Sequence, residues 1–382
     1  MSIDERLANT QFPLPVIRQV NQAKHPTAIG LGLGELRDFP VDTKVLDAIQ
    51  EALHSDGTNY TANAGLPKLR QAVAKRQYAT DGFNYSSEHV VVTIGVQNAM
   101  YAAIKTLAKL GAKRVLIPAI NFGIYRKIPL DFGMEAVTYP LTPDFGIDLA
   151  RLSEMVLPDD LIVINSPSNP TGRVLTVQEQ KELALVLKSC LTGGYVLSDE
   201  IYSQLVYEGE PATSFSAFFE RTIVLDGISK SAATAGLRVG WIVTRNLKLA
   251  QAFTSNNTTV ISCPPTLNQY GAIPVVNGDT QPTIDSYNQT LLKNRNHAVG
   301  ILKKNQIPVV VPRGSFYLFP ELSYRIHSPV KQFCIELAKR PDGVVVIPGE
   351  AFDAPGYIRI SLATDQIEEG MNRLVRMLKE QK

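Results

Sequence analysis

Lys230 is the residue with the clearest capacity for chemistry. It follows the apolar run 222–226, which predicts a buried strand, and it stands among small residues with Arg238 a short distance on. A lysine in a closed site can lose its proton and attack an aldehyde to form a Schiff base. An arginine suits a phosphate, because its planar guanidinium can donate two parallel hydrogen bonds. The stretch 229–241 therefore predicts a Schiff-base and phosphate site or, taken alone, a loop with two surface cations.

Polar residues also follow other predicted strands. A glycine turn at 93–98 leads into a helix, whose N-terminus would present free N–H groups to an anion. The segment 165–172 follows a second strand, and Asp199 and Tyr202 follow a third. Because ligands bind at the carboxyl ends of parallel strands, we expect these groups to share one rim with Lys230. A pyridoxal phosphate site needs this set, since a carboxylate must keep the pyridine nitrogen protonated.

Apolar runs alternate with amphipathic helices over most of the chain. The runs are continuous rather than alternating, which favours an α/β fold with a parallel sheet covered on both faces. The run 239–244 follows Lys230 too closely for a crossover helix, so we expect it to lie antiparallel to its neighbours. The expected strands are 89–93, 114–117, 136–139, 161–165, 195–198 and 222–225, and the expected helices are 43–53, 66–78, 97–110 and 177–187.

The pattern changes near residue 288, where helices mix with short apolar runs. This predicts a smaller α+β domain at 286–382, joined by an N-terminal arm at 1–42, beside a large domain at 43–285. The expected elements of the small domain are helices at 291–305, 330–339 and 366–378 and apolar runs at 308–311, 315–319, 344–347 and 357–361.

Composition narrows the class of protein. The 382 residues carry a net charge of +2, which argues against nucleic acid or an anionic membrane as a partner. The three cysteines are scattered, and the histidines show no metal spacing, so we predict neither a disulfide framework nor a metal site. The N-terminus lacks the apolar core of a signal peptide, and no run reaches membrane-spanning length, so we expect a cytoplasmic protein.

In their joint order, these motifs resemble the class I/II aminotransferases of pyridoxal-phosphate fold type I, the aspartate aminotransferase-like family. The resemblance covers nearly the whole chain. It implies a mostly parallel, seven-stranded-type sheet, a homodimer with shared active sites, and pyridoxal 5′-phosphate as cofactor. The resemblance is carried by Tyr60 with Gly65 and Leu69-Arg70, and by 165–172, 199–202, 229–230, 236–241, 314–317, 348–352 and 359–361.

The family implies a role for each matching residue. Lys230 would hold the cofactor as an internal aldimine and, once displaced, carry the proton between the substrate Cα and C4′ of the cofactor. Asp199 would pair with the pyridine nitrogen, and Asn169 and Tyr202 would hydrogen-bond the phenolic oxygen. Phe122 would stack on the ring. Lys230, Asp199 and Tyr202 are therefore the catalytic candidates.

The phosphate and the substrate would be held by a further set of residues. The phosphate would contact Ser229, Arg238, the backbone of Gly95, Val96 and Gln97, and Tyr60 reaching across from the other subunit. The substrate α-carboxylate would be gripped bidentately by Arg359, with the backbone of Gly34 and the Asn169 side chain beside it.

The expected activity is transfer of an amino group between an α-amino acid and a 2-oxo acid by ping-pong chemistry. A lyase, decarboxylase or cyclase of the same fold is an alternative, and so is a non-catalytic binding protein, although the complete residue set argues against the latter. A dinucleotide site at 30–40 is disfavoured, because the third glycine of that motif is missing and Pro40 interrupts the expected helix.

Three departures from the family pattern bear on the substrate. The segment 35–39 has an extra residue and no proline where the family commonly reads Gly-Glu-Pro-Asp-Phe. Val96 and Gln97 replace smaller or charged residues, and Arg313 stands where an acidic residue is usual. We expect the first and third near the substrate entrance, which leaves the amino donor and the roles of Arg37 and Arg313 open.

Overall fold

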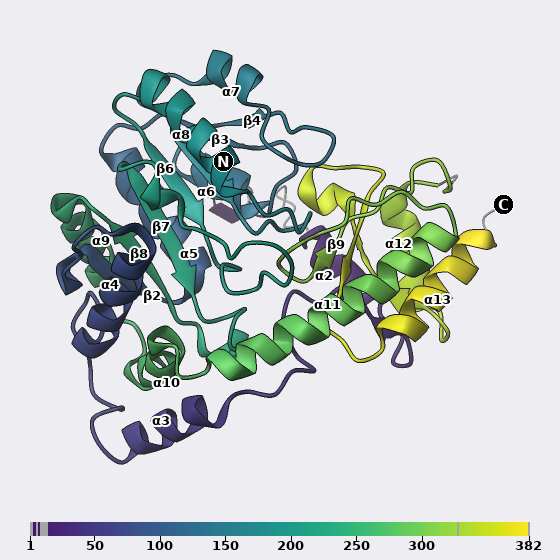
Figure 1. Cartoon of the computed structure of the whole chain (residues 1–382), viewed down its shortest axis with the longest axis horizontal. Helices are drawn as coiled ribbons and strands as arrows, with labels where there is room; N and C mark the ends of the chain where they lie inside the picture. Colours follow the sequence, from purple (N-terminus) through teal and green to yellow (C-terminus); the bar gives the residue numbers. More distant parts are fainter. Residues whose placement is uncertain (1–2, 5–6, 8–13, 327, 381–382) are drawn as a thin grey trace.

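A seven-stranded sheet lies at the centre of the computed structural model, which describes residues 3–4, 7, 14–326 and 328–380 (Figure 1). Its strands are β2 (Val90–Thr93), β3 (Arg114–Pro118), β4 (Glu135–Tyr139), β5 (Leu161–Asn165), β6 (Tyr195–Asp199), β7 (Thr222–Gly227) and β8 (Gly240–Thr244). Their order is β2-β8-β7-β6-β5-β3-β4. The strands from β3 to β7 pair in parallel, and β8 runs antiparallel to both β2 and β7. The predicted antiparallel strand is therefore confirmed.

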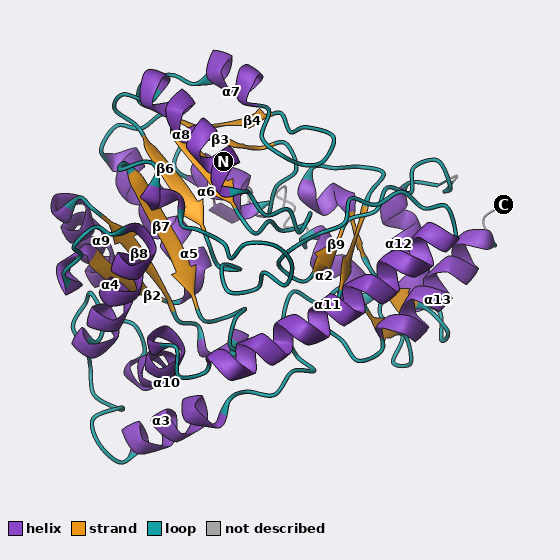
Figure 2. Cartoon of the chain, in the orientation of Figure 1, coloured by secondary structure: helices purple, strands orange, loops and turns teal. Residues whose placement is uncertain are grey.

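Helices cover both faces of this sheet (Figure 2). One face packs on α5 (Gly95–Lys109), α6 (Ile124–Asp131) and α9 (Leu247–Val260), and the other on α4 (Pro67–Asp81), α7 (Leu149–Met155), α8 (Val177–Cys190) and α10 (Thr266–Asn277). In β5, Leu161 and Val163 pack in the core on the α5, α6 and α9 side, while Ile162 and Ile164 pack on the α7 and α8 side. Both sides of a strand are thus buried, which explains the continuous apolar runs and confirms the α/β fold.

Several helices have no counterpart in the sequence prediction, namely α6, α7, α9 and α10. Helix α10 shows why, since it contains Gly271 and Pro274 and packs between α4 and α3 (Thr43–Leu53). A Cβ on Gly271 would lie 2.8 Å from the Ile49 side chain, so the two helices approach closely at this glycine. A helix that is apolar on several sides gives no one-sided periodicity, and the pattern therefore does not reveal it.

The C-terminal part forms a separate α+β unit, at the right of Figure 1. It contains β9 (Tyr317–Leu318), α12 (Val330–Lys339), β10 (Val344–Val345), β11 (Ile347–Pro348), the 3-10 helix η4 (Gly349–Phe352), β12 (Ile358–Ser361) and α13 (Ile367–Lys379), together with α2 (Val16–Gln22) and β1 (Ile29–Gly30) from the N-terminal segment. Strand β1 pairs in parallel with β10, and β12 lies between β11 and β9. The predicted arm at 1–42 lies partly outside the described residues, and its described part joins this unit.

Helix α11 (Gln281–Lys304) links the two units and begins ten residues before the predicted helix. The domain boundary predicted at 285/286 therefore falls inside a continuous helix. The apolar run 308–311 forms no strand in the described part of the chain, and Val309 and Val310 instead pack on the hydrophobic cores. The run 344–347 divides between two sheets, since Val345 pairs with β1 and Ile347 with β12.

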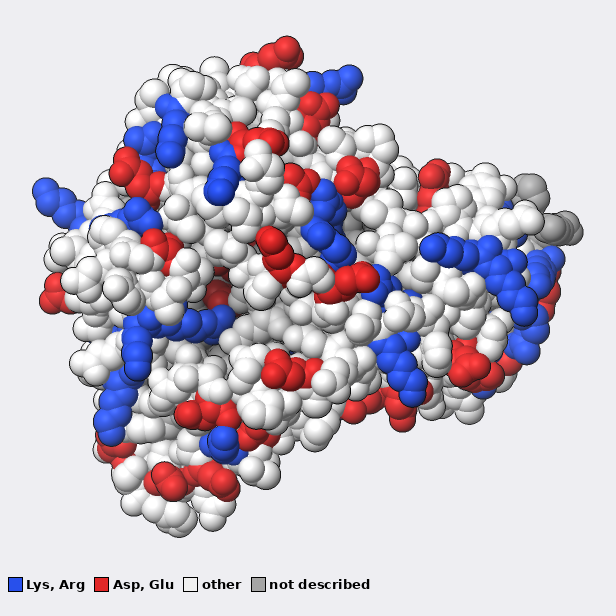
Figure 3. All heavy atoms as spheres, viewed as in Figure 1, with Lys and Arg blue, Asp and Glu red and all other residues white. Residues whose placement is uncertain are grey.

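Charged side chains of both signs are interspersed over the face seen in Figure 3. Within the described residues, no helix is long and apolar enough to cross a membrane. All three cysteines are free thiols.

Candidate active site

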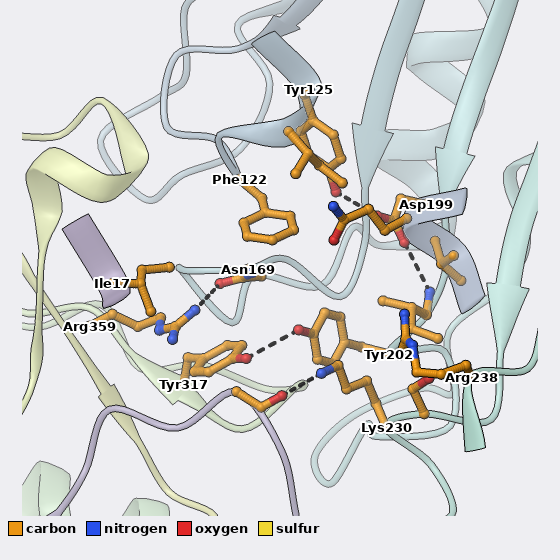
Figure 4. A pocket seen from close by; sticks show the side chains of 16 residues that line it. Ile17, Phe122, Tyr125, Asn169, Asp199, Tyr202, Lys230, Arg238, Tyr317 and Arg359 are labelled. Atoms are coloured by element: carbon orange, nitrogen blue, oxygen red, sulfur yellow. Dashed lines mark hydrogen bonds between the residues drawn. The ribbon is translucent and has the colours of Figure 1, made fainter. Parts of the chain in front are cut away.

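A cavity of about 270 Å³ lies at the carboxyl ends of the central strands, where the C-terminal unit meets the sheet (Figure 4). Most of the predicted site residues line it, namely Gly34, Val96, Gln97, Phe122, Asn169, Asp199, Tyr202, Ser229, Lys230, Arg238 and Arg359. It is also lined by Ile17, Ile124, Tyr125, Ile201 and Tyr317, to which the sequence analysis gave no role. The structure therefore brings together residues that span most of the chain.

The register of the sheet explains much of this convergence. Asn165, at the end of β5, pairs with Asp199, at the end of β6, and Asp199 pairs with Leu225 in β7. The polar segments that follow these strands consequently leave the sheet side by side. The Asn165 Nδ2 also donates to the Asp199 carbonyl oxygen at 2.9 Å, which ties the first two strand ends together.

An anion cradle forms where β2 and β8 meet. Thr93 at the end of β2 pairs with Gly240 at the start of β8, so Gly95 and Arg238 lie next to each other. Gly95 adopts φ +74°, and a Cβ there would lie only 2.6 Å from the Arg238 Nη2, so this position requires glycine. Helix α5 begins at Gly95 and directs its free N–H groups, including that of Val96, to the same place.

Asp199 is 5% exposed and accepts two hydrogen bonds. The Tyr125 hydroxyl donates to its Oδ2 at 2.6 Å, and the Ile201 N–H donates to its Oδ1 at 3.3 Å. Burial raises the pKa of Asp199 to about 6, although the Tyr125 hydrogen bond acts to lower it. Tyr125 is thus a residue that the sequence analysis missed. The only sequence signal was a second aromatic in the loop after β3, three residues beyond Phe122.

Lys230 reaches the cavity from the loop after β7, and its Nζ donates to the carbonyl oxygen of Gly34. Burial lowers the pKa of Lys230 to about 8, and the neighbouring cations Arg359 and Arg238 lower it further in the same direction. A lysine whose pKa approaches neutrality has an accessible unprotonated form, which is the form that attacks carbonyl carbon.

Arg359, on β12, is a buried cation that is 3% exposed. Its Nη1 donates to the Asn169 Oδ1 at 2.9 Å, and its Nη2 donates to the Gly32 carbonyl oxygen at 3.0 Å. No carboxylate among the described residues pairs with it, and its Nε has no partner there. An uncompensated buried charge is unfavourable, so this guanidinium is suited to a ligand carboxylate.

Tyr202 and Tyr317 meet at the floor of the cavity, with their hydroxyl oxygens 3.2 Å apart. Tyr317 comes from β9 in the C-terminal unit, and in the sequence it stands out only as part of the family motif at 314–317. Burial and the adjacent Tyr317 raise the pKa of Tyr202 well above its ordinary value, so its hydroxyl remains a hydrogen-bond donor near neutral pH.

Phe122 lies across the cavity from the two tyrosines (Figure 4). Its ring packs edge-to-face against Tyr125, with centroids 6.2 Å apart, and Ile17 and Ile124 add to the apolar wall. These side chains limit the access of water to the buried polar groups.

Two predicted site residues do not line this cavity: Gly95, which lies against Arg238 in the anion cradle, and Tyr60. The Tyr60 side chain is 92% exposed, on the loop between α3 and α4. Arg37 lines an adjoining cavity of about 840 Å³ and pairs with Glu35 at 2.6 Å. Arg313 lines neither cavity, and its Nη2 donates to the Val174 carbonyl oxygen at 3.0 Å. Its expected place near the substrate entrance stays a prediction.

The donor set fits pyridoxal phosphate. The helix N-terminus with Arg238 and Ser229 forms a phosphate cradle, Asp199 offers a buried carboxylate for a ring nitrogen, and Lys230 lies between them as an amine of lowered pKa. These three kinds of group match the phosphate, the pyridine nitrogen and the aldehyde of the cofactor.

Comparisons with known proteins agree with this chemistry. Residues 26–378 match the family described as aminotransferase class I and II. The chain is 32% identical to aromatic-amino-acid aminotransferase 2 of Thermococcus litoralis, covering 93% of this chain and 92% of that protein. It is also 32% identical to a probable aspartate/prephenate aminotransferase of Aquifex aeolicus, covering 94% and 93%.

Solved structures give the same result. The aspartate aminotransferase of Thermus thermophilus with maleate superposes with a TM-score of 0.88 at 25% identity, covering 98% of this chain and 99% of that one. An aromatic aminotransferase of Pyrococcus horikoshii superposes with a TM-score of 0.85 at 29% identity, covering 96% and 99%. The chain therefore belongs to the class I and II aminotransferases, and it is a pyridoxal-phosphate-dependent enzyme of fold type I that transfers amino groups.

Proposed function

We propose that the enzyme binds the amino and carboxylate groups of an α-amino acid between Lys230 and Arg359. The observation that carries this proposal is the buried Arg359 guanidinium, which has no carboxylate partner among the described residues and shares a cavity with Lys230. The two groups that an α-amino acid or a 2-oxo acid presents at one carbon are a carboxylate and an amine or carbonyl. An arginine and a reactive lysine in one closed site are suited to that pair.

When bound, pyridoxal phosphate supplies an aldehyde that condenses with amines and a protonated ring that withdraws electrons from the substrate Cα. Arg359 donates to both carboxylate oxygens and thereby fixes the Cα. Lys230, as the neutral amine, takes the proton from that Cα, because burial and the neighbouring guanidinium groups favour its unprotonated form. Asp199 keeps the proton on the pyridine nitrogen, and Tyr202 and Asn169 donate to the phenolic oxygen.

Ser229, Arg238 and the N–H groups of Val96 and Gln97 hold the phosphate in this proposal. The phosphate cradle would be completed in a homodimer by Tyr60 from the second subunit. The support for this step is the 92% exposure of Tyr60, which leaves its hydroxyl free to serve a site other than the one in its own chain. A tyrosine hydroxyl can donate to a phosphate oxygen while its ring limits the access of water.

The adjoining cavity of about 840 Å³ would take the substrate side chain. Its wall combines apolar residues such as Leu33 and Ala351 with the cations Arg18 and Arg126. Aspartate and the aromatic amino acids, which appear in the names of the relatives, are therefore the first donors to test. The domain limits 1–42, 43–285 and 286–382 and a cytoplasmic location also remain proposals, the latter supported by three free thiols.

A donor screen with product analysis tests the proposed function. Each α-amino acid is incubated with a 2-oxo acid, and we expect the new amino acid and the new 2-oxo acid to form in equal amounts. Lys230→Ala should lose the near-visible absorbance of the bound cofactor and nearly all turnover, whereas Lys181→Ala, at an exposed position on α8, should behave as wild type. Borohydride reduction and peptide mapping should label Lys230. Release of ammonia without a new amino acid, or label on another lysine, would contradict the assignment.

A further inference from the structure

Tyr317 is held in the cavity by both units of the chain. Strand β9 pairs antiparallel with β12, with Tyr317 opposite Ser361. The preceding turn is fixed to the sheet unit, because the Ser315 N–H donates to the Leu205 carbonyl oxygen at 2.8 Å. That turn requires Gly314, since a Cβ there would lie 2.8 Å from the same carbonyl oxygen. The Tyr317 side chain is 1% exposed, so its position is determined on all sides.

The ring of Tyr317 supports the guanidinium of Arg359. The Arg359 Cζ lies 4.3 Å from the Tyr317 ring centroid and 4.9 Å from that of Phe352. A guanidinium over an aromatic face gains cation–π attraction and is restricted in its tilt. Together with the hydrogen bonds to Asn169 and Gly32, this contact fixes the plane in which Arg359 can meet a carboxylate.

The hydroxyl of Tyr317 lies beside the groups that face the cofactor. It is 3.2 Å from the Tyr202 hydroxyl, and a Cβ on Gly34 would lie only 3.0 Å from it. The Gly34 carbonyl oxygen in turn accepts the Lys230 hydrogen bond. Tyr317 therefore contacts Arg359, the proposed carboxylate-binding residue, through its ring. Its hydroxyl contacts Tyr202, a proposed cofactor-binding residue.

We propose that Tyr317 is a positioning residue with two separable effects: its ring sets the plane of Arg359 for the substrate α-carboxylate, and its hydroxyl directs the Tyr202 hydroxyl toward the phenolic oxygen of the cofactor. The inference rests on the proposed roles of Arg359 and Tyr202. A hydroxyl that accepts a hydrogen bond from Tyr317 becomes a better donor to its own acceptor. The ionisable groups that face Tyr202 are Tyr317, Arg359, Asp199 and Tyr125.

Two measurements separate the two effects. The first is the pH at which the near-visible absorbance of the bound cofactor titrates. A donor to the phenolic oxygen stabilises its anionic form and so makes the neighbouring nitrogen less basic, and weakening that donor should raise this pH. The second is the dissociation constant of an α-methyl amino acid, which offers a carboxylate and an amine but has no Cα proton to lose.

Tyr317→Phe should raise the titration pH, by less than Tyr202→Phe does, and leave the dissociation constant within about twofold because the ring remains. The double variant should match Tyr202→Phe alone, since both hydroxyls act on one acceptor. Tyr317→Met and Tyr317→Leu both remove the ring, and two such variants are made so that at least one that folds is available. Each should also raise the dissociation constant of the α-methyl amino acid about tenfold. Tyr139→Phe removes a buried hydroxyl that donates to Val163 at 2.9 Å and lines neither cavity, and it should change neither quantity.

Other results would overturn the inference. An unchanged titration pH in Tyr317→Phe, or additive shifts in the double variant, would contradict the proposed role of the hydroxyl. Equal affinities of the phenylalanine and aliphatic variants for the α-methyl amino acid would contradict the proposed role of the ring. If the wild-type protein itself shows no near-visible cofactor band or does not bind the α-methyl amino acid, the proposed function fails first, so the two failures are distinguishable.

Discussion

Burial acts in opposite directions on the two charged groups that face the cofactor. It lowers the pKa of Lys230 to about 8 and raises the pKa of Asp199 to about 6. At pH 7 roughly one tenth of the lysine is then neutral, while most of the carboxylate is ionised. A neutral amine is the nucleophile, and an ionised carboxylate is the partner of a pyridinium. Near neutral pH most of Asp199 is therefore in its working state, and a minor but accessible fraction of Lys230 is in the neutral form.

Tyr125→Phe should raise the pH below which cofactor binding weakens. The hydroxyl of Tyr125 donates to Asp199 and lowers its pKa, so its loss raises that pKa further above the ordinary value. The apoprotein must ionise Asp199 to hold a pyridinium, so cofactor affinity falls as the pH drops through this pKa. Affinity measured between pH 5 and 8 should begin to fall at a higher pH in the variant. Tyr139→Phe is the matched control, and superimposable curves for Tyr125→Phe and wild type would contradict this role.

At the scale of elements, the phosphate cradle depends on one antiparallel pair. Strand β8 joins β2 to the rest of the sheet, and the loop before β8 thereby brings Arg238 against the first turn of α5. The approach is close at Gly240 as well, where a Cβ would lie 2.7 Å from the Gly95 carbonyl carbon. Two glycines on neighbouring elements thus let a helix N-terminus and an arginine share one anion.

Gly95→Ala should weaken cofactor binding through Arg238. The added methyl would overlap the guanidinium, so we expect the arginine to move and the affinity to fall by roughly one to two orders of magnitude, the scale of a lost charge-assisted hydrogen bond. Gly111→Ala is the matched control, because Gly111 also has a positive φ, of 104°, but nothing within 4 Å of its Cβ position. Both variants should lose roughly 1–2 kcal/mol of unfolding free energy, because alanine disfavours a positive φ. Equal cofactor affinity in the two would contradict the cradle.

At the scale of the whole molecule, the site needs more than one part of the chain. The central sheet supplies Lys230 and Asp199, while the C-terminal unit supplies Arg359 and Tyr317. Tyr60 does not line this cavity, and its side chain is 92% exposed. The family resemblance implies a homodimer with shared sites, and an exposed Tyr60 is available to a second subunit, so a homodimer is part of the proposed function.

Mixed dimers test the shared site. A Tyr60→Phe chain and a Lys230→Ala chain, each impaired alone, should form heterodimers in which one site receives an intact Lys230 and an intact Tyr60. Under random pairing of equal amounts, about one quarter of all sites would then be complete. Cofactor affinity and activity across mixing ratios should therefore pass through a maximum. A strictly additive curve, or a fully active monomer by sedimentation, would show that Tyr60 serves no second subunit.

Local patterns in the sequence were enough to predict the sheet and most of the chemistry at its rim. Continuous apolar runs predict strands buried on both faces, and the polar residues after those runs predict one rim, because both signals are local in the chain. Lys230, Asp199, Asn169, Tyr202 and Arg238 stand at or just after such positions, whereas Arg359 was named from the family resemblance alone, and all six line the cavity. Helices such as α10 were not predicted, because burial on several sides removes the hydrophobic periodicity on which helix prediction depends.

Long-range packing selects the further groups that complete the site. Tyr125 and Tyr317 carry no distinctive spacing, and they matter because packing places their hydroxyls 2.6 Å from Asp199 and 3.2 Å from Tyr202. The lowered pKa of Lys230 likewise comes from burial and from guanidinium groups that are distant in the sequence. Contacts of this kind depend on long-range packing, whereas a sequence pattern records only what lies within a few residues along the chain.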